Sequence, residues 1–114
     1  MTESSGVFTF PRTGLYLIRV HLSVNTLSSN NLDYCGPYIQ ISTNSGGAYD
    51  RVSEAYTAAD HGTRYTNASA QAIVSVTNVS TFRLRIETEA NGNFNVRASN
   101  GQSVIDFIRL GDST

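Results

Sequence analysis

The sequence predicts an all-β fold in which two antiparallel sheets pack face to face, as a sandwich or jelly roll of about eight strands. Two observations carry this prediction. Apolar and polar residues alternate along most of the chain, and almost no stretch shows the three-to-four-residue spacing of a helix. Clusters of Gly, Asn, Ser and Asp, which favour turns, separate the alternating runs.

The first two strands are expected at Gly6–Phe10 and Leu15–Val24, separated by the turn signal Pro11-Arg12-Thr13-Gly14. Alternation divides the second strand into two faces. The face assigned to the core carries Tyr16, Ile18, Val20, Leu22 and Val24. The face assigned to the outside carries Leu15, Leu17, Arg19, His21 and Ser23.

The middle of the chain has the weakest pattern. Asn25–Gly36 is expected to be a polar loop, and Pro37–Thr43 resumes alternation before the turn signal Asn44-Ser45-Gly46-Gly47. A weaker strand is predicted within Ala48–Ala58, followed by an exposed loop at Ala59–Asn67.

Three further strands are predicted at Ala68–Thr77, Thr81–Thr88 and Asn93–Ala98. Between the last two, Asn91-Gly92 is expected to form a type I′ hairpin turn, because both residues tolerate positive φ.

The final strand, Ser103–Leu110, is apolar on both faces. Val104, Ile108 and Leu110 share one face, and Ile105 and Phe107 share the other. A strand of this kind is normally covered on both sides. A small chain has one core, so we expect another subunit to cover the face of Ile105 and Phe107.

Composition excludes several classes of partner. The 114 residues are expected to form one domain, with Met1–Ser5 as a short N-terminal segment. Eight Arg, no Lys and nine acidic residues give a net charge of -1, which offers no excess positive potential to nucleic acid or anionic lipid. No apolar run is long enough for membrane insertion, and no secretion signal is visible. Abundant Ser, Thr and Asn predict a neutral, polar surface.

The segment Gly6–Tyr16, GVFTFPRTGLY, resembles the G-x-F-T-x-P-x-x-G-x-Y opening of the complement-C1q/tumour-necrosis-factor jelly-roll superfamily. The later strands match that family in order and pattern. The resemblance implies a homotrimeric, non-enzymatic head that binds proteins, glycans or cell surfaces. Family domains usually have a further strand ahead of this motif, beside the C-terminal strand. Ser103–Leu110 is therefore expected to be an unprotected edge, and either the domain is a shortened version of the family fold or a partner chain supplies the missing strand.

Short modules of this type without Lys look similar to bacteriophage fibre heads, to capsid decorations and to the heads of collagen-like bacterial surface proteins. The absence of a secretion signal and of a Gly-x-y stalk favours a virion surface, where the partners would be other virion proteins or a glycan or protein of the host cell surface. A secreted or bacterial cell-surface location is the alternative.

The strong catalytic signatures are missing from the sequence, and we expect neither an enzyme nor a cofactor or metal. His21 and Cys35 have the residue types of a nucleophile pair, but His21 lies on a strand and both are interpreted as structural, with Cys35 a buried thiol. Asp60, His61 and Arg64 are interpreted as a solvated loop. Asp33 and Asp50 have calcium-ligand chemistry without the EF-hand spacing.

Two surfaces are the candidate sites. A ligand surface is predicted in the Tyr-rich middle, where tyrosine suits both protein interfaces and sugar stacking, at Tyr49, Asp50, Arg51, Tyr56, His61, Arg64 and Tyr65. Packing of about half of the tyrosines on the sandwich is the other interpretation. A trimer interface is predicted at Ile105, Phe107, Arg109, Arg83 and Arg85. For Arg83 and Arg85, a solvated face with cross-strand ion pairs is the other interpretation.

The leading hypothesis is therefore a trimeric structural and adhesion head. A monomeric, lectin-like carbohydrate-binding sandwich is the alternative, although such modules display a planar set of exposed aromatic residues and this chain has no Trp. A small metal-dependent cupin-like enzyme is the third class. Its metal needs two or three His on facing strands, and the chain has only His21 and His61.

Overall fold

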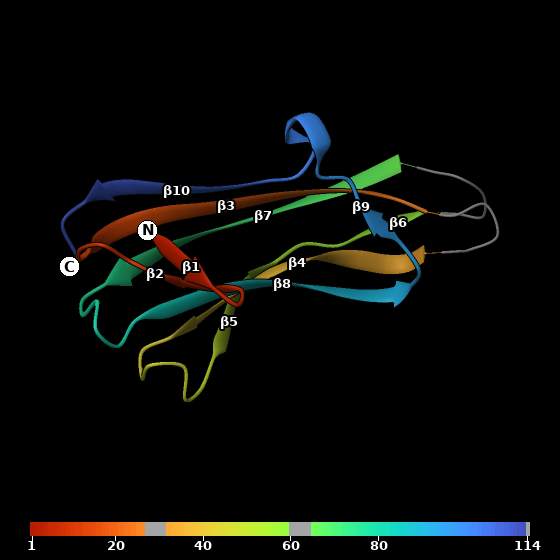
Figure 1. The fold of residues 1–114 in the computed structure, drawn as a ribbon. Coiled ribbons are helices and arrows are strands. Elements are labelled where there is room, and N and C mark those ends of the chain that lie inside the picture. The colour runs from red at the N-terminus through yellow and green to blue at the C-terminus, as the bar shows by residue number, and fades with distance from the viewer. Residues whose placement is uncertain (27–31, 60–64, 114) are drawn as a thin grey trace.

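The computed structural model describes residues 1–26, 32–59 and 65–113. The chain forms two antiparallel β-sheets packed as a sandwich, as predicted, and its described part contains ten strands rather than about eight (Figure 1). The strands are β1 (Thr2–Ser4), β2 (Val7–Thr9), β3 (Gly14–Asn25), β4 (Leu32–Ser42), β5 (Asp50–Glu54), β6 (Thr57–Ala59), β7 (Tyr65–Val76), β8 (Arg83–Gly92), β9 (Asn95–Val96) and β10 (Val104–Gly111). A single 3-10 turn, η1 (Ser99–Gly101), lies between β9 and β10.

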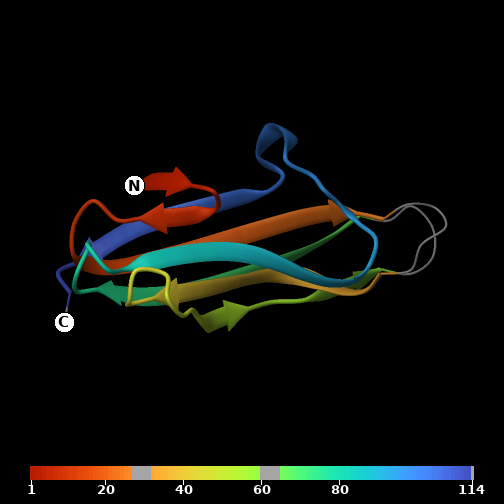
Figure 2. The same ribbon diagram turned by 60° about the horizontal axis from the view of Figure 1, so that its bottom comes forward.

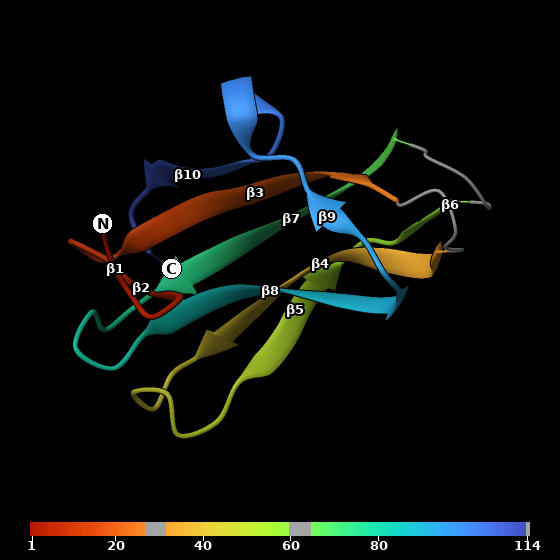
Figure 3. The same cartoon turned by 45° about the vertical axis from the view of Figure 1, so that its right-hand side comes forward.

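The six-stranded sheet has the order β1-β2-β8-β4-β5, and β6 also pairs with β4. The four-stranded sheet has the order β10-β3-β7, and β9 pairs with the end of β3. Figure 3 shows these as two layers, with β10, β3 and β7 in one and β8, β4 and β5 in the other. The chain passes repeatedly from one layer to the other, so neighbouring strands in a sheet are mostly distant in sequence. No helix among the described residues is long and apolar enough to cross a membrane.

The core lies between the inner faces of the two sheets. The face of β3 assigned to the core is buried along its whole length, from Tyr16 to Val24. Phe10 packs edge-on against Tyr16 and Phe82, with ring centroids 4.7 and 5.2 Å apart. A second cluster at the other end of the sandwich contains Leu22, Val24, Leu32 and Cys35. Cys35 is a buried free thiol, as the sequence analysis expected.

The N-terminal segment forms a hairpin that the sequence analysis missed. Ser5 and Gly6 have φ values of 52° and 79°, the left-handed conformation that a two-residue type I′ turn requires. The turn joins β1 to β2, and β2 pairs with β8, so the hairpin extends one edge of the six-stranded sheet (Figure 2). The polar loop was also predicted too long, since β4 begins at Leu32.

The hairpin predicted at Asn91-Gly92 is wrong. Asn91 and Gly92 belong to β8 and pair with Tyr34 and Leu32 of β4. The chain then crosses to the other sheet, where Val96 of β9 pairs with β3. Pairing along the whole of β4 overrides the local turn preference here, because a continued ladder satisfies backbone groups that a hairpin would expose.

The two faces of β10 are the reverse of those predicted. Phe107 lies opposite Ile18 of β3, and opposite residues of an antiparallel pair share a face, so its ring enters the core. There it contacts Phe8, with ring centroids 4.9 Å apart. Ile105 is on the same inner side, opposite Val20, where the sandwich opens at its edge. The outer face of β10 carries Val104 and Ile108 instead. β10 has β3 as its one neighbour in the described sheet and forms an edge, as expected.

Candidate functional site

Polar and aromatic side chains cover the outer face of the six-stranded sheet. Alternate residues of β8 point outward, and their cross-strand neighbours on β4 lie beside them. Arg85 pairs with Gln40, Glu87 with Tyr38, and Glu89 with Gly36. We call the resulting set the Tyr/Arg/Glu cluster, and it comprises Tyr34, Tyr38, Tyr49, Arg51, Glu54, Tyr56, Arg85, Glu87 and Glu89.

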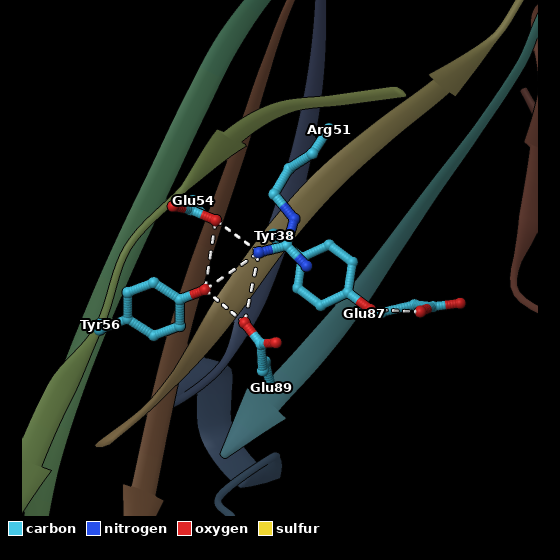
Figure 4. Close-up of polar contacts among 6 residues, drawn as sticks. All are labelled: Tyr38, Arg51, Glu54, Tyr56, Glu87 and Glu89. Carbon is cyan, nitrogen blue, oxygen red and sulfur yellow. Dashed lines mark hydrogen bonds and ion pairs between the residues drawn. The ribbon is translucent and has the colours of Figure 1, made fainter. Parts of the chain in front are cut away.

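Arg51 of β5 is the centre of one half of the cluster (Figure 4). Its Nη1 donates to Glu54 at 2.5 Å, to Glu89 at 3.2 Å and to the Tyr56 hydroxyl at 3.1 Å. The Tyr56 hydroxyl donates in turn to Glu89 at 2.5 Å. The guanidinium also lies 3.8 Å from the centre of the Tyr38 ring, in a cation–π contact. One arginine thus joins β4, β5 and β8.

A second stack repeats this arrangement nearby. The guanidinium of Arg85 lies 3.9 Å from the centre of the Tyr49 ring, and its Nε donates to Gln40 at 2.5 Å. Glu87 connects the two stacks, since it lies 3.4 Å from Arg85 and accepts a 2.6 Å hydrogen bond from Tyr38. The cluster is therefore one continuous strip of contacts across the sheet.

Gly36 allows Tyr56 to reach this strip. A Cβ at position 36 would lie 1.6 Å from the carbonyl oxygen of Ala55 and 2.9 Å from the Cα of Tyr56. The chain between β5 and β6 crosses directly over the glycine, held by a 3.1 Å hydrogen bond from the Ala55 amide to the Pro37 carbonyl. A side chain at position 36 would push Tyr56 away from Glu89.

The contacts hold the cluster in one ionisation state. The Tyr56 hydrogen bond, followed by that of Arg51, lowers the pKa of Glu89 below its ordinary value. The same hydrogen bond raises the pKa of Tyr56 to about 12. The hydrogen bond to Glu87 likewise raises the pKa of Tyr38. Both tyrosines therefore stay protonated and Glu89 stays ionised at neutral pH. Three glutamates against two arginines leave the cluster with one net negative charge.

At one end of the strip the surface is hollowed. A shallow cavity of about 310 Å³ is lined by Tyr34, Tyr56 and Glu89. The two rings meet at 85°, with their centroids 5.6 Å apart. They are among the most exposed large side chains of the six-stranded sheet, at 40% for Tyr34 and 42% for Tyr56. This cavity is the part of the cluster open to a ligand.

The structure brings together part of the ligand surface predicted from the sequence. Tyr49, Arg51 and Tyr56 lie in the cluster, and Asp50 is exposed beside it at the start of β5. Tyr65 does not join them, because it begins β7 in the other sheet, where Arg97 covers its ring at 4.3 Å. His61 and Arg64 lie outside the described residues.

Glu87 and Glu89 were not selected from the sequence as residues of the ligand surface. Glu87 and Glu89 follow Arg85 at a spacing of two on β8, a pattern that indicates one outward face. This spacing does not indicate which strand lies beside β8. Only the pairing of β8 with β4 places Tyr38 beside Glu87, and only the crossing at Gly36 places Tyr56 beside Glu89.

The predicted trimer interface does not form one surface. Arg83 and Arg85 lie on the six-stranded sheet, whereas Ile105, Phe107 and Arg109 belong to β10 of the four-stranded sheet. Arg83 donates to the carbonyl of Phe82 at 2.8 Å. Arg109 binds the carbonyl of Thr13 at 3.2 Å and Asp112 at 3.0 Å. The other interpretation, cross-strand ion pairs of Arg83 and Arg85, is not what the structure shows, since the ion pair of Arg85 is with Glu87 of its own strand.

The outer face of the four-stranded sheet has a different character. Ile108, Leu17 and Ile73 form an apolar row across β10, β3 and β7. The next row contains the ion pair between Arg19 and Asp106, at 3.0 Å.

The third row on this face contains His21. Its Nδ1 lies 2.7 Å from the Ser69 hydroxyl, beside Val104, and an open hollow of about 470 Å³ spans the second and third rows. Cys35 is buried inside the sandwich, so the two proposed members of a nucleophile pair lie on different sides of a sheet. Within residues 1–26, 32–59 and 65–113, no three His, Cys, Asp or Glu side chains are grouped as metal ligands.

A comparison of the sequence with protein-family models finds no match, and a comparison with curated proteins finds no related chain. The function is therefore inferred from the geometry of the two outer faces.

Proposed function

We propose that this chain is a non-enzymatic head domain that assembles as a homotrimer through the outer face of β10, β3 and β7. The proposal rests on one observation. The most exposed aliphatic side chains of the described residues are concentrated in the four-stranded sheet, with Ile73 65% exposed and Leu110 53% exposed. Ile108 and Val104 are also exposed on the outer face, whereas Val96 and Ile105 are exposed where the inner face opens at the edge of the sheet. Exposed apolar surface such as the row of Ile108, Leu17 and Ile73 marks association sites in soluble proteins.

The polar residues of this face suit an interface with a defined register. The Arg19–Asp106 ion pair lies directly beside the apolar row of Ile108, Leu17 and Ile73. An apolar centre bordered by paired charges is the usual anatomy of a protein interface. The charged row disfavours orientations in which apolar surface of the neighbouring subunit covers it, because the Arg19–Asp106 pair would then lose its hydration.

Three subunits, rather than two, are proposed on the resemblance of Gly6–Tyr16 to the C1q/tumour-necrosis-factor opening. The strand order supports a jelly-roll interpretation, since the chain alternates between two antiparallel sheets as it does in paired Greek keys. The neutral, Ser/Thr/Asn-rich composition and the same resemblance support a virion surface as the location, in a capsid decoration or a fibre head.

The Tyr/Arg/Glu cluster is the proposed contact surface of the assembled head. It lies on the six-stranded sheet, on the opposite side of the sandwich from β10, β3 and β7 (Figure 3). Burial of the apolar face in a trimer would leave it exposed. Its partner would be another virion protein or a molecule of the host surface.

The alternative, a monomeric carbohydrate-binding module, expects a flat platform of aromatic rings. The cluster offers little support for one. Arg51 and Arg85 cover the rings of Tyr38 and Tyr49, and the two rings left open stand at 85° to each other.

Light scattering coupled to size exclusion tests the assembly. The wild-type chain, of 12.4 kDa, is expected to give a scattering mass three times that of one chain. Ile73→Glu places an unpaired charge in the apolar row and should produce a folded monomer, with unchanged far-ultraviolet circular dichroism. Val52→Glu is the matched control, because Val52 is an aliphatic residue 40% exposed on the other sheet, and it should remain trimeric. A wild-type monomer at micromolar concentration would refute the proposal.

A further inference from the structure

The rings of Tyr34 and Tyr56 form an open aromatic corner. One ring points its edge at the face of the other, at an interplanar angle of 85°, and each is about two-fifths exposed. The cavity is therefore bounded by two aromatic rings whose planes meet near a right angle. The negative face of an aromatic ring attracts cations, so two such faces around one cavity favour a positively charged ligand.

Glu89 forms the third wall of this corner and adds a full negative charge. Its Oε2 accepts hydrogen bonds from Tyr56 and Arg51. Among the described residues its Oε1 has no hydrogen-bond partner, so that oxygen remains open toward a ligand. Arg51 does not cancel this charge, because the same guanidinium is shared with Glu54.

The other surface tyrosines show that this chain places cations over tyrosine rings. Arg51 covers Tyr38, Arg85 covers Tyr49 and Arg97 covers Tyr65, at 3.8, 3.9 and 4.3 Å from the ring centres. In the described part of the chain, no guanidinium lies over Tyr34 or Tyr56. Their ring faces are the ones left for a cation supplied from outside.

Hydrogen bonding narrows the class of ligand. The Tyr56 hydroxyl already donates to Glu89, and Arg51 is already bound to two glutamates, so the corner offers few donors to a sugar. One carboxylate is also too few ligands to hold a metal ion. A quaternary ammonium group suits the corner better, because it has no N–H to satisfy and is attracted through its methyl groups to π faces.

We propose that the corner formed by Tyr34, Tyr56 and Glu89 binds a quaternary ammonium group, such as the choline head of a lipid or polymer or a trimethylated lysine. This inference rests on the proposed contact role of the Tyr/Arg/Glu cluster, whose ligand class it names. It does not require the trimer, because all three residues belong to one chain.

Titration with choline, followed by backbone and side-chain NMR, tests this site. Choline is expected to bind saturably and to shift the resonances of Tyr34, Tyr56 and Glu89. Its neutral isostere 3,3-dimethyl-1-butanol has the same shape without the charge, and it should bind about 5-fold to 30-fold more weakly. Phosphocholine and an N-acetyl trimethyl-lysine amide are parallel arms. Tighter binding of either supports the proposal and identifies the source of the group.

Three variants make the test specific. Tyr34→Leu removes one aromatic wall of the corner and Glu89→Gln removes the negative charge of another, so each is expected to weaken choline binding by about 10-fold. Tyr65→Leu is the matched control, because Tyr65 is an exposed tyrosine of the other sheet, and it should bind choline as the wild type does. Glu89→Gln is nearly isosteric and lies on the surface, so the test survives even if Tyr34→Leu does not fold.

Three results would overturn the proposal. They are equal binding of the neutral isostere, no choline binding by a folded wild-type chain, and shifts at these residues with simple sugars but not with choline. The Ile73→Glu variant, which is expected to be a monomer, tests choline binding independently of trimer formation. Choline binding by that monomer would uphold the site even where the trimer fails. A wild-type trimer that ignores choline would refute the site alone.

Discussion

The hydroxyl of Tyr56 donates a 2.5 Å hydrogen bond to the carboxylate of Glu89, and this contact joins the residue before β6 to the second half of β8. It stabilises the protonated tyrosine and the ionised glutamate together. The pKa of Tyr56 is raised to about 12, mainly by this bond, and the pKa of Glu89 is lowered by it. The two residues form a single electrostatic unit.

The pair has a defined pH window. Its contribution to folding is fully present between the ordinary pKa of Glu89, 4.5, and that of Tyr56, 10.0. It is lost as the pH rises through about 12, and again as the pH falls through the lowered pKa of Glu89. Tyrosinate absorbance of the folded protein should show that Glu89→Gln moves one tyrosine back toward its ordinary pKa. An unchanged titration curve would contradict the assignment.

Gly36→Ala is expected to destabilise the fold and open the cluster at the same time. The new methyl group would overlap the carbonyl oxygen of Ala55, so the connection between β5 and β6 must move and carry Tyr56 with it. We expect a loss of about 1–3 kcal/mol in the free energy of unfolding, measured by chemical denaturation. The pKa of Tyr56 should also return toward its ordinary value, because its hydroxyl would no longer reach Glu89. Gly111→Ala is the control, since a Cβ there meets nothing within 4 Å, and it should change stability by less than about 0.5 kcal/mol.

The two faces of β10 should respond differently to truncation. Phe107→Ala removes a ring that packs against Phe8 and Phe10, and it should cost about 3 kcal/mol of unfolding free energy. Ile108→Ala removes a side chain from the outer face and should cost less than about 1 kcal/mol. Both are best measured in the Ile73→Glu monomer, where assembly does not contribute. Equal costs would mean that β10 is not oriented as described.

Cys35 should be unreactive in the native protein. Its side chain is fully buried in the second core cluster, and burial raises the pKa of the thiol, which leaves little of the reactive thiolate. A coloured disulfide reagent is expected to modify it only in denaturant, at a rate that follows global unfolding. Rapid labelling without denaturant would show that this end of the sandwich opens locally.

Part of the candidate site was predictable because it depends on residue type. Tyr49, Arg51 and Tyr56 were selected because tyrosines and charged residues are interleaved in this stretch, and the structure places all three in the cluster. Glu89 was not selected, because nothing near it in the sequence distinguishes it from any surface glutamate. Its role depends on Tyr56, which is 33 positions away and reaches it only across Gly36.

The sequence by itself determined the all-β class and the inner and outer faces of β3 and β8, since a strand alternates with a period of two wherever it pairs. The expectation that β10 would be an edge came from the family resemblance of Gly6–Tyr16 rather than from the pattern of the strand itself. Only the tertiary structure decided which face of β10 is buried, that β8 continues through Asn91-Gly92, and which rings the arginines cover. These features depend on register between distant strands. A shift of one residue reverses every side chain, and register is set by packing across the sandwich rather than by neighbours in the chain.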